Sequence, residues 1–313
     1  MKLRLFQVIS SLAVVITAVS LVSVLPASGQ APSAAAKAWT PDKTPDGQPD
    51  IIGMYTRAGV KALEAQPPVN PIDPGEKNPL SVSNRPEDDL GPYPGIFGQG
   101  GNVLRGGARP QARRTGIVDP PDRNLPWKPE ADARRRQWLL DMNPPKSLQH
   151  VELNSRCALP GPFEGEDGNN PYTILQRPGS VVILYDYNHT SRVIDLNRKE
   201  HLGKNIRLFM GDSIGHWEGN TLVVDTTNYN GQIAYSREIP RLTDALHTVE
   251  RFTIVDENIM DYEVTIDDPN QFTRPWKVAG SFTRAAKGVE SLEFACAEGS
   301  ITLSNMFGEP PAR

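Results

Sequence analysis

Residues Gly211 to Thr227 have the sequence GDSIGHWEGNTLVVDTT. At its centre Gly219-Asn220 suits a two-residue type II′ hairpin turn between two strands. The stretch therefore predicts a loop, a strand, a tight turn and a second strand. It also contains a histidine, a tryptophan and three carboxylates, so fold signal and reactive side chains coincide here.

The chain after Tyr172 continues as a series of short apolar or alternating runs separated by polar turns, with no helical period between them. Short connections of this kind favour an antiparallel meander. We predict a mainly β domain closed into a lipocalin-like barrel, with a β-sandwich as the alternative. A barrel of about eight strands encloses room for one small ligand. The predicted strands are 172–176, 181–185, 192–194, a strand entering 217, 221–227, 248–255, 259–266, 276–282 and 291–297.

The first half of the chain has a different composition. Between Pro32 and Pro171 lie 22 of the 29 prolines, which interrupt helices and remove donors from sheets. One short helix is predicted over 129–142, because Pro129 suits a first helical turn and Trp138, Leu139 and Met142 share one side. We predict a Pro/Gly-rich arm over 31–153, a β domain at 154–307 and a tail at 308–313. Spaced aromatic residues favour an arm that wraps the β domain, and a mobile arm is the alternative.

The N-terminus has the pattern of a secretory signal peptide over residues 1–30. Lys2 and Arg4 precede an apolar run from Leu5 to Leu25, and small residues follow from Ala27. We expect a periplasmic or secreted protein with no stable membrane insertion after cleavage; an uncleaved anchor is the alternative. Because an exported chain is in an oxidising compartment, Cys157 and Cys296 are expected to form a disulfide.

Charge and motifs exclude several functions. A net charge of −4 and a pI near 5.8 argue against a nucleic-acid partner. The chain has no dinucleotide or P-loop glycine motif, so no nucleotide cofactor is predicted. Its five histidines lack HxH or HExxH spacing, which predicts no metal site and leaves open one assembled across strands. No cofactor is predicted, and the sequence leaves the oligomeric state open.

The predicted hairpin around Asp256-Glu257-Asn258 places Glu250 on an apolar face. Pairing Val255 with Ile259 puts Glu250 among apolar neighbours on both strands, because side chains alternate between faces. A buried carboxylate either has a raised pKa and can act as a general acid or base, or it pairs with a structural partner. The candidate partners are Arg192, Arg274 or a backbone amide. On the opposite, solvent-facing side we predict the cross-strand pairs Arg251–Glu263 and His247–Asp267.

The hairpin at Gly219-Asn220 places His216 and Asp225 on one face, opposite Trp217, Leu222 and Val224. An aspartate near a histidine orients the ring and strengthens it as a base. We therefore take His216, Glu250 and Asp225 as candidate catalytic residues. The candidate ligand-binding residues are Tyr185, Arg192, Trp217 and Trp276.

Several segments together resemble a family of exported bacterial proteins with a GDSxGHWEGxTLVVDTT signature. The resemblance covers about Asn154 to Phe307 and implies export and a single domain, with no established activity. In relatives the residue after the second cysteine is often histidine, whereas here it is Ala297. Besides residues 211–227, the segments are YDYNH from Tyr185, LHTVERF from Leu246, VTIDDP from Val264, TRPW from Thr273 and ACAEG from Ala295.

Two functions are compatible with these patterns. The first is an exported enzyme that uses carboxylate and imidazole groups for hydrolysis, elimination or isomerisation of a small, partly apolar substrate in the barrel. The second is a non-catalytic lipocalin-like carrier of a small ligand. Convergence of Glu250 and His216 in one cavity favours the enzyme, and an apolar cavity favours the carrier.

Overall fold

The computed structural model describes residues 39–57, 116–142, 144–151, 155, 157, 161–162, 171–186, 190–234, 239, 241–286, 288–290, 295–296, 303 and 307. All of the described strands lie in the compact unit Thr40–Arg313. The predicted signal peptide, residues 58–115 of the predicted arm and the predicted tail are outside the described residues.

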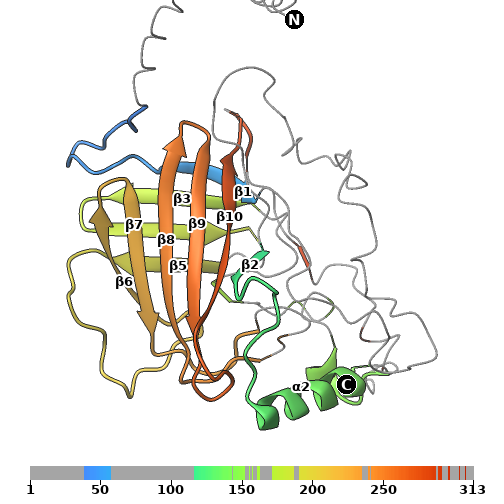
Figure 1. Ribbon diagram of the computed structural model, residues 1–313. Helices are drawn as coiled ribbons and strands as arrows, with labels where there is room; N and C mark the ends of the chain where they lie inside the picture. Colours follow the sequence, from blue (N-terminus) through green and yellow to red (C-terminus); the bar gives the residue numbers. More distant parts are fainter. Residues whose placement is uncertain are drawn as a thin grey trace, which may run out of the picture. The chain divides into compact units, whose positions relative to one another are not determined.

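Nine strands form a closed ring of hydrogen-bonded neighbours. The order is β1-β3-β4-β5-β6-β7-β8-β9-β10, and β10 pairs with β1 to complete the ring. In Figure 1, β3 and β5 run across the direction of β7 to β10, as expected for a barrel whose sheet curls back on itself. The mainly β, closed-barrel prediction is confirmed, and the sandwich alternative is wrong. The strands are β1 (Gly53–Arg57), β3 (Tyr172–Arg177), β4 (Ser180–Tyr185), β5 (Thr190–Asp195), β6 (Asp212–Glu218), β7 (Thr221–Thr227), β8 (His247–Asp256), β9 (Ile259–Asp267) and β10 (Trp276–Arg284).

One neighbouring pair departs from the predicted antiparallel meander. Strands β5 and β6 are parallel and pair only through Ile194 with Ser213 and Asp195 with Ile214. Residues 196–211 connect them, and parallel strands need a crossover connection of about this length. The other pairs in the ring are antiparallel.

The predicted arm contributes more regular structure than its composition indicated. Helix α2 (Pro129–Asp141) is confirmed, with its proline in the first turn, and a 3-10 turn follows at η2 (Leu148–His150). The arm also supplies β1, which closes the barrel, and β2 (Gly116–Asp119), which pairs with another part of β10. The predicted boundary at residue 154 is therefore wrong for the barrel, because one barrel strand comes from before it.

The end of the predicted β domain differs as well. Residues 291–294 and 297 of the last predicted strand are outside the described residues, whereas Ala295 and Cys296 lie outside any strand. The predicted disulfide between Cys157 and Cys296 is confirmed, with a Cα–Cα distance of 5.8 Å. Within the described residues, no helix has the length and apolar character to span a bilayer.

Glycines allow the Gly211 to Thr227 hairpin to pack closely. Gly219 has a φ of +60° at the turn while Asn220 does not have a positive φ, which agrees with the predicted type II′ geometry. At Gly211, with a φ of +70°, a Cβ atom would lie 2.6 Å from Thr226 Cγ2. At Gly215 it would lie 2.8 Å from Ile194 Cγ2, so β6 can approach β5 only without a side chain there.

Candidate functional site

Glu250 points into the barrel, as alternation along β8 predicts. It pairs with Val264 across β9, and Arg251 faces Glu263, so the predicted register is confirmed apart from a shift near the turn. Glu250 is 1% exposed. Its burial follows from its position between Thr248 and Phe252 on a face that is otherwise closed to solvent.

A buried arginine neutralises this carboxylate. Arg192 on β5 donates from Nη2 to Glu250 Oε2 at 2.5 Å, and Tyr262 donates its hydroxyl proton to Glu250 Oε1 at 3.0 Å. Arg192 is held in place by Ser213 Oγ at 2.9 Å from Nε and by Thr226 Oγ1 at 2.7 Å from Nη2. Of the partners considered from the sequence, the structure selects Arg192.

The ion pair shifts the pKa of Arg192. Burial alone would lower the pKa of Arg192, but the charge of Glu250 outweighs it and holds that pKa well above its usual value. Glu250 is therefore not a lone buried carboxylate, because Arg192 and Tyr262 each bind one of its oxygens. Of the two roles that the sequence allowed for this residue, its contacts are those of a structural ion pair.

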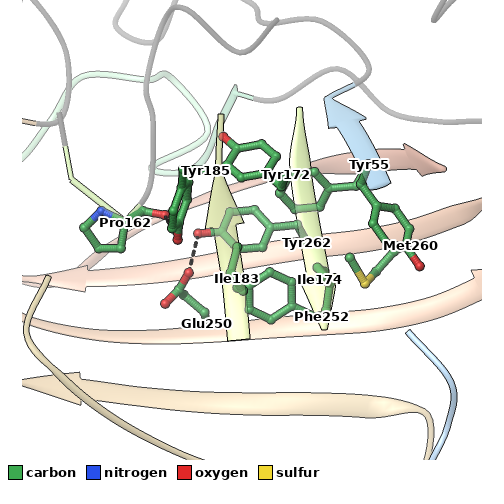
Figure 2. Close-up of a pocket in the computed structure, with 11 residues that line it drawn as sticks. Tyr55, Pro162, Tyr172, Ile174, Ile183, Tyr185, Glu250, Phe252, Met260 and Tyr262 are labelled. Atoms are coloured by element: carbon green, nitrogen blue, oxygen red, sulfur yellow. Dashed lines mark hydrogen bonds between the residues drawn. The ribbon is translucent and has the colours of Figure 1, made fainter. Parts of the chain in front are cut away.

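Above Glu250 lies a small cavity lined mainly by aromatic and aliphatic side chains (Figure 2). Its volume is about 20 Å³, which holds about one water molecule. The Tyr185 hydroxyl donates to the backbone carbonyl of Pro162 at 3.1 Å, which ties β4 to the segment beside the cavity. The lining residues are Tyr55, Pro162, Tyr172, Ile174, Ile183, Tyr185, Glu250, Phe252, Met260, Tyr262 and Phe282.

The other two predicted catalytic residues lie on the outer face of the barrel. His216 has a side chain that is 55% exposed and contacts Glu218 Oε1 at 3.1 Å. Asp225 is half-exposed, one strand over on β7. The prediction that they converge with Glu250 around one pocket is wrong. The inward face of this hairpin is the one with Leu222 and Val224, and alternation directs His216 and Asp225 outward.

An outer-face network links Asp225 to two histidines. His201 Nε2 and His247 Nε2 each lie 3.0 Å from Asp225 Oδ1, and His201 Nδ1 lies 3.0 Å from Asp212 Oδ2. Arg198 also donates to Asp212 at 2.7 Å. His201 lies in the connection between β5 and β6, where no motif or periodic pattern indicates a functional residue. In the described part of the chain, no group of three or more His, Cys, Asp or Glu side chains is arranged to hold a metal ion.

The network shifts the pKa of both members of its outer pair. Partial burial alone would raise the pKa of Asp225, but hydrogen bonds with His247 and His201 and their charges hold it below its usual value. The hydrogen bond to Asp225 raises the pKa of His247, and the charge of Asp267 adds to the effect. His247 therefore faces Asp267 in the predicted register but forms its ion pair with Asp225.

The predicted Arg251–Glu263 ion pair is replaced in a similar way. Arg251 binds Glu218 at 2.6 Å, and Glu263 binds Lys277 at 2.8 Å. Both contacts are on the outer face, where neighbouring strands on either side compete for the same charges. Strand register fixes which residues are opposite, but a long side chain reaches across to another strand.

Of the four predicted ligand-binding residues, Tyr185 lines the cavity. Arg192 does not line it but binds Glu250, which does. Trp276 is fully buried against Phe272, with ring centroids 5.5 Å apart, and Trp217 is partly buried against the core. Neither tryptophan is among the residues that line the cavity. The lining side chains on β3 and β9 share the inward phase of their strands, so alternation from Tyr172 and from Tyr262 is the signal that identifies them.

Comparison with known proteins gives no family. No family model matches the chain, and no curated protein matches its sequence. The resemblance of residues 154–307 to a family of exported bacterial proteins stays a prediction.

Solved structures with partial likeness include three β proteins. The REP1-NXSQ fatty acid transporter is 10% identical, with 39% of this chain and 73% of that chain covered and a TM-score of 0.25. Wild-type fluorescent protein UnaG is 15% identical, with 37% and 72% covered and a TM-score of 0.22. A secretary abundant heat soluble protein from Ramazzottius varieornatus is 9% identical, with 46% and 86% covered and a TM-score of 0.26.

Proposed function

We propose that this protein is a carrier that binds a small, largely apolar molecule in the aromatic end of its barrel. The observation that supports this most directly is the composition of the cavity. Its walls are tyrosine, phenylalanine, isoleucine and methionine side chains, and its one charged member is already paired. Binding sites for small molecules are typically concave, apolar and supplied with few polar groups.

The same observation weakens the enzyme hypothesis. A general acid or base must exchange a proton with the substrate, so it needs both contact and a suitable pKa. Glu250 lines the cavity, but Arg192 and Tyr262 already bind its two oxygens, whereas His216 and Asp225 lie on the outer face of the barrel. We therefore favour the carrier over acid–base catalysis.

Binding requires the aromatic rings that fill the cavity to move. Three edge contacts hold them, with ring centroids 5.1 Å apart for Tyr172–Tyr185, 5.4 Å for Tyr172–Phe282 and 5.2 Å for Tyr262–Phe282. Each such contact contributes about 0.5–1.5 kcal/mol, so breaking all three costs at most about 4.5 kcal/mol. Because each buried CH₂ group contributes about 0.8 kcal/mol, a ligand that buries about six of them offsets this cost.

We also propose that the carrier acts outside the cytoplasm. The N-terminal thirty residues have the pattern of a signal peptide, and the Cys157–Cys296 disulfide is typical of oxidising compartments. Mass spectrometry of the N-terminus of the protein purified from its host tests this. A mature chain that begins near residue 30 supports export. A full-length chain that keeps Met1 and is recovered from the cytosol contradicts it.

The carrier proposal is tested with a neutral fluorescent probe, N-phenyl-1-naphthylamine, and a pair of matched variants. Ile183→Phe adds volume inside the cavity, whereas Val193→Phe adds the same ring type on the exposed outer face of the adjacent strand. We expect the parent and Val193→Phe to enhance and blue-shift probe fluorescence saturably, and Ile183→Phe to bind at least ~tenfold more weakly. Absence of saturable binding by the folded parent protein contradicts the proposal.

Native mass spectrometry of the protein from its host supplies the second readout. A carrier is expected to retain a small molecule that is released by organic solvent. Loss of that mass from Ile183→Phe but not from Val193→Phe would place the molecule in the cavity.

A further inference from the structure

We propose that the ligand of this cavity is a neutral molecule with a hydrogen-bond donor, such as a hydroxyl group, that binds Glu250, and that it has no carboxylate at that end. This inference rests on the proposed carrier function and specifies its ligand class. It follows from which hydrogen-bonding groups the protein itself already uses.

The cavity retains hydrogen-bond acceptors but few donors. Three of its four tyrosines donate their hydroxyl protons to protein atoms: Tyr55 to the Ile51 carbonyl at 3.1 Å, Tyr185 to the Pro162 carbonyl at 3.1 Å and Tyr262 to Glu250 at 3.0 Å. A ligand that offers only acceptors therefore competes with bonds that the protein has already made.

Glu250 has unused acceptor capacity. An ionised carboxylate has about four lone-pair positions on its two oxygens. Within the part of the chain that the structure describes, one hydrogen bond reaches each oxygen: Arg192 Nη2 donates to Oε2, and the Tyr262 hydroxyl donates to Oε1. Because Glu250 lines the cavity, an incoming hydroxyl group can donate to it without displacing either partner.

An anionic ligand meets the opposite situation. No cation is among the described residues that line the cavity, and Glu250 places a negative charge there. Arg192 forms an ion pair with Glu250, and its Nε and Nη2 groups donate hydrogen bonds to Ser213, Thr226 and Glu250. Arg192 Nη1 is buried with no hydrogen-bond partner in the described part of the chain, but Arg192 is not a lining residue. A ligand carboxylate at this end would therefore lose its hydration, find no cation among the lining residues and lie nearer to Glu250 than to Arg192, which is unfavourable for a charged group.

The test is displacement of N-phenyl-1-naphthylamine from the full-length protein at pH 8 by three compounds of matched length. These are 1-decanol, its isomer 1-methoxynonane, which accepts but does not donate, and decanoate, which is ionised. We expect 1-decanol to displace the probe at a concentration at least ~tenfold below that of either other compound. Only 1-decanol can donate a hydrogen bond to the Glu250 carboxylate, and a hydrogen bond to a charged group contributes more than one between neutral groups. Equal or stronger displacement by decanoate, or equal displacement by the ether, overturns the inference.

Two variants locate the selectivity at Glu250. Glu250→Gln removes the carboxylate and leaves Arg192 without its counter-ion. The ratio of the concentrations at which decanoate and 1-decanol displace the probe should therefore fall by at least ~tenfold. Glu218→Gln removes an outer-face carboxylate that is likewise bound to an arginine, so it should leave the parent's selectivity unchanged. Unchanged selectivity in a folded Glu250→Gln protein contradicts the inference; if that variant does not fold, the three-compound series on the parent decides.

Failure of this inference is distinguishable from failure of the carrier proposal. If the probe does not bind the parent protein, the carrier proposal itself fails. If the probe binds and Ile183→Phe weakens it, but decanoate is the best competitor, the carrier proposal stands and the ligand class inferred here is wrong.

Discussion

Removal of one member of the buried Arg192–Glu250 pair should destabilise the barrel far more than removal of both. Glu250→Leu leaves a guanidinium group without a counter-ion at a position where the side chain is 1% exposed. Breaking a buried ion pair in this way typically costs about 3–5 kcal/mol. The Tyr262 hydroxyl also loses its acceptor, which adds about 1–3 kcal/mol. Since domains of this kind have only about 5–15 kcal/mol of stability, the variant is expected to be close to unfolding at 25 °C.

The double variant Arg192→Met/Glu250→Leu should recover most of this loss. Replacing a buried pair by apolar residues of similar volume is often neutral or stabilising. Ser213 and Thr226 lose their guanidinium donor but keep the hydrogen bond between their hydroxyl groups, at 3.0 Å. We therefore expect the double variant to lie within about 2 kcal/mol of the parent and the coupling energy of the cycle to be about 3 kcal/mol or more.

Urea unfolding followed by tryptophan fluorescence, with the disulfide intact, measures the four free energies of unfolding. Tyr262→Phe serves as the control, because it removes one hydrogen bond to Glu250 and leaves the ion pair in place. Additive single-variant costs in the double variant would refute the reasoning. So would a Glu250→Leu protein that loses less than about 1 kcal/mol, since the pair would then contribute no more than a surface one.

Three further predictions concern other parts of the fold. The pKa of His247 is higher in the folded protein than in the unfolded chain, so its contribution to stability is complete at pH values below the unfolded-state pKa and is lost as pH rises through the folded-state pKa. The pKa of Asp225 is lower in the folded protein, so its contribution is lost as pH falls through the folded-state pKa. Asp225→Asn should therefore lower the free energy of unfolding more at pH 6 than at pH 9. The difference should be less than about 1 kcal/mol, because both side chains are 40% exposed. The same substitution should lower the pKa of His247 measured by NMR. Gly211 has a φ of +70°, and an added Cβ would lie 2.6 Å from Thr226 Cγ2, so Gly211→Ala should lower the free energy of unfolding by about 1–3 kcal/mol. An unchanged midpoint of urea unfolding would contradict the packing described. Replacing both Cys157 and Cys296 by alanine opens a loop with a sequence separation of 139 and should lower the unfolding free energy by about 4–5 kcal/mol, whereas a change below about 1 kcal/mol would contradict the chain-entropy argument.

Local alternation was enough to predict the strands that carry the site. On β8 and β9, apolar residues at every second position identify the inward face, and the turn at Asp256-Glu257-Asn258 sets the register. Glu250 was placed inside by the same argument, with Arg192 as a candidate partner. These predictions succeeded because each depends on neighbours within one strand or one hairpin.

Features that depend on distant segments were missed. Strand β1 is only five residues long and lies in a proline-rich region, so its sequence alone gives little signal. Its place in the barrel depends on two partners, β3 and β10, that follow much later in the chain. The parallel pairing of β5 and β6 depends on the path of residues 196–211, which have no periodic pattern. His216 and Asp225 lie on the outer face because the apolar residues Leu222 and Val224 occupy the inner one; reactive side chains on a strand face do not identify it as the inner face.

The GDSIGHWEGNTLVVDTT segment can now be interpreted through its contacts. Ser213 and Thr226 hold Arg192 in position for Glu250, and Gly215 permits the close approach of β6 to β5. Asp212 accepts hydrogen bonds from the Leu202 amide and from Arg198, and so fastens the crossover connection to the start of β6. Each of these roles supports the junction between β5 and β6 and the ion pair inside it.

A specific motif of this kind is therefore a poor guide to the reaction or ligand of the protein. Apart from the carboxylate that the motif helps to position, the cavity is lined by side chains from β1, β3, β4, β8, β9 and β10 and by Pro162, all outside the motif. Exchanges among these residues can change the size and polarity of the cavity while the β5–β6 junction stays intact. We expect ligand preference to follow substitutions at positions such as Ile183, Met260 and Phe282, and the stability of the barrel to follow those at Ser213, Gly215 and Thr226.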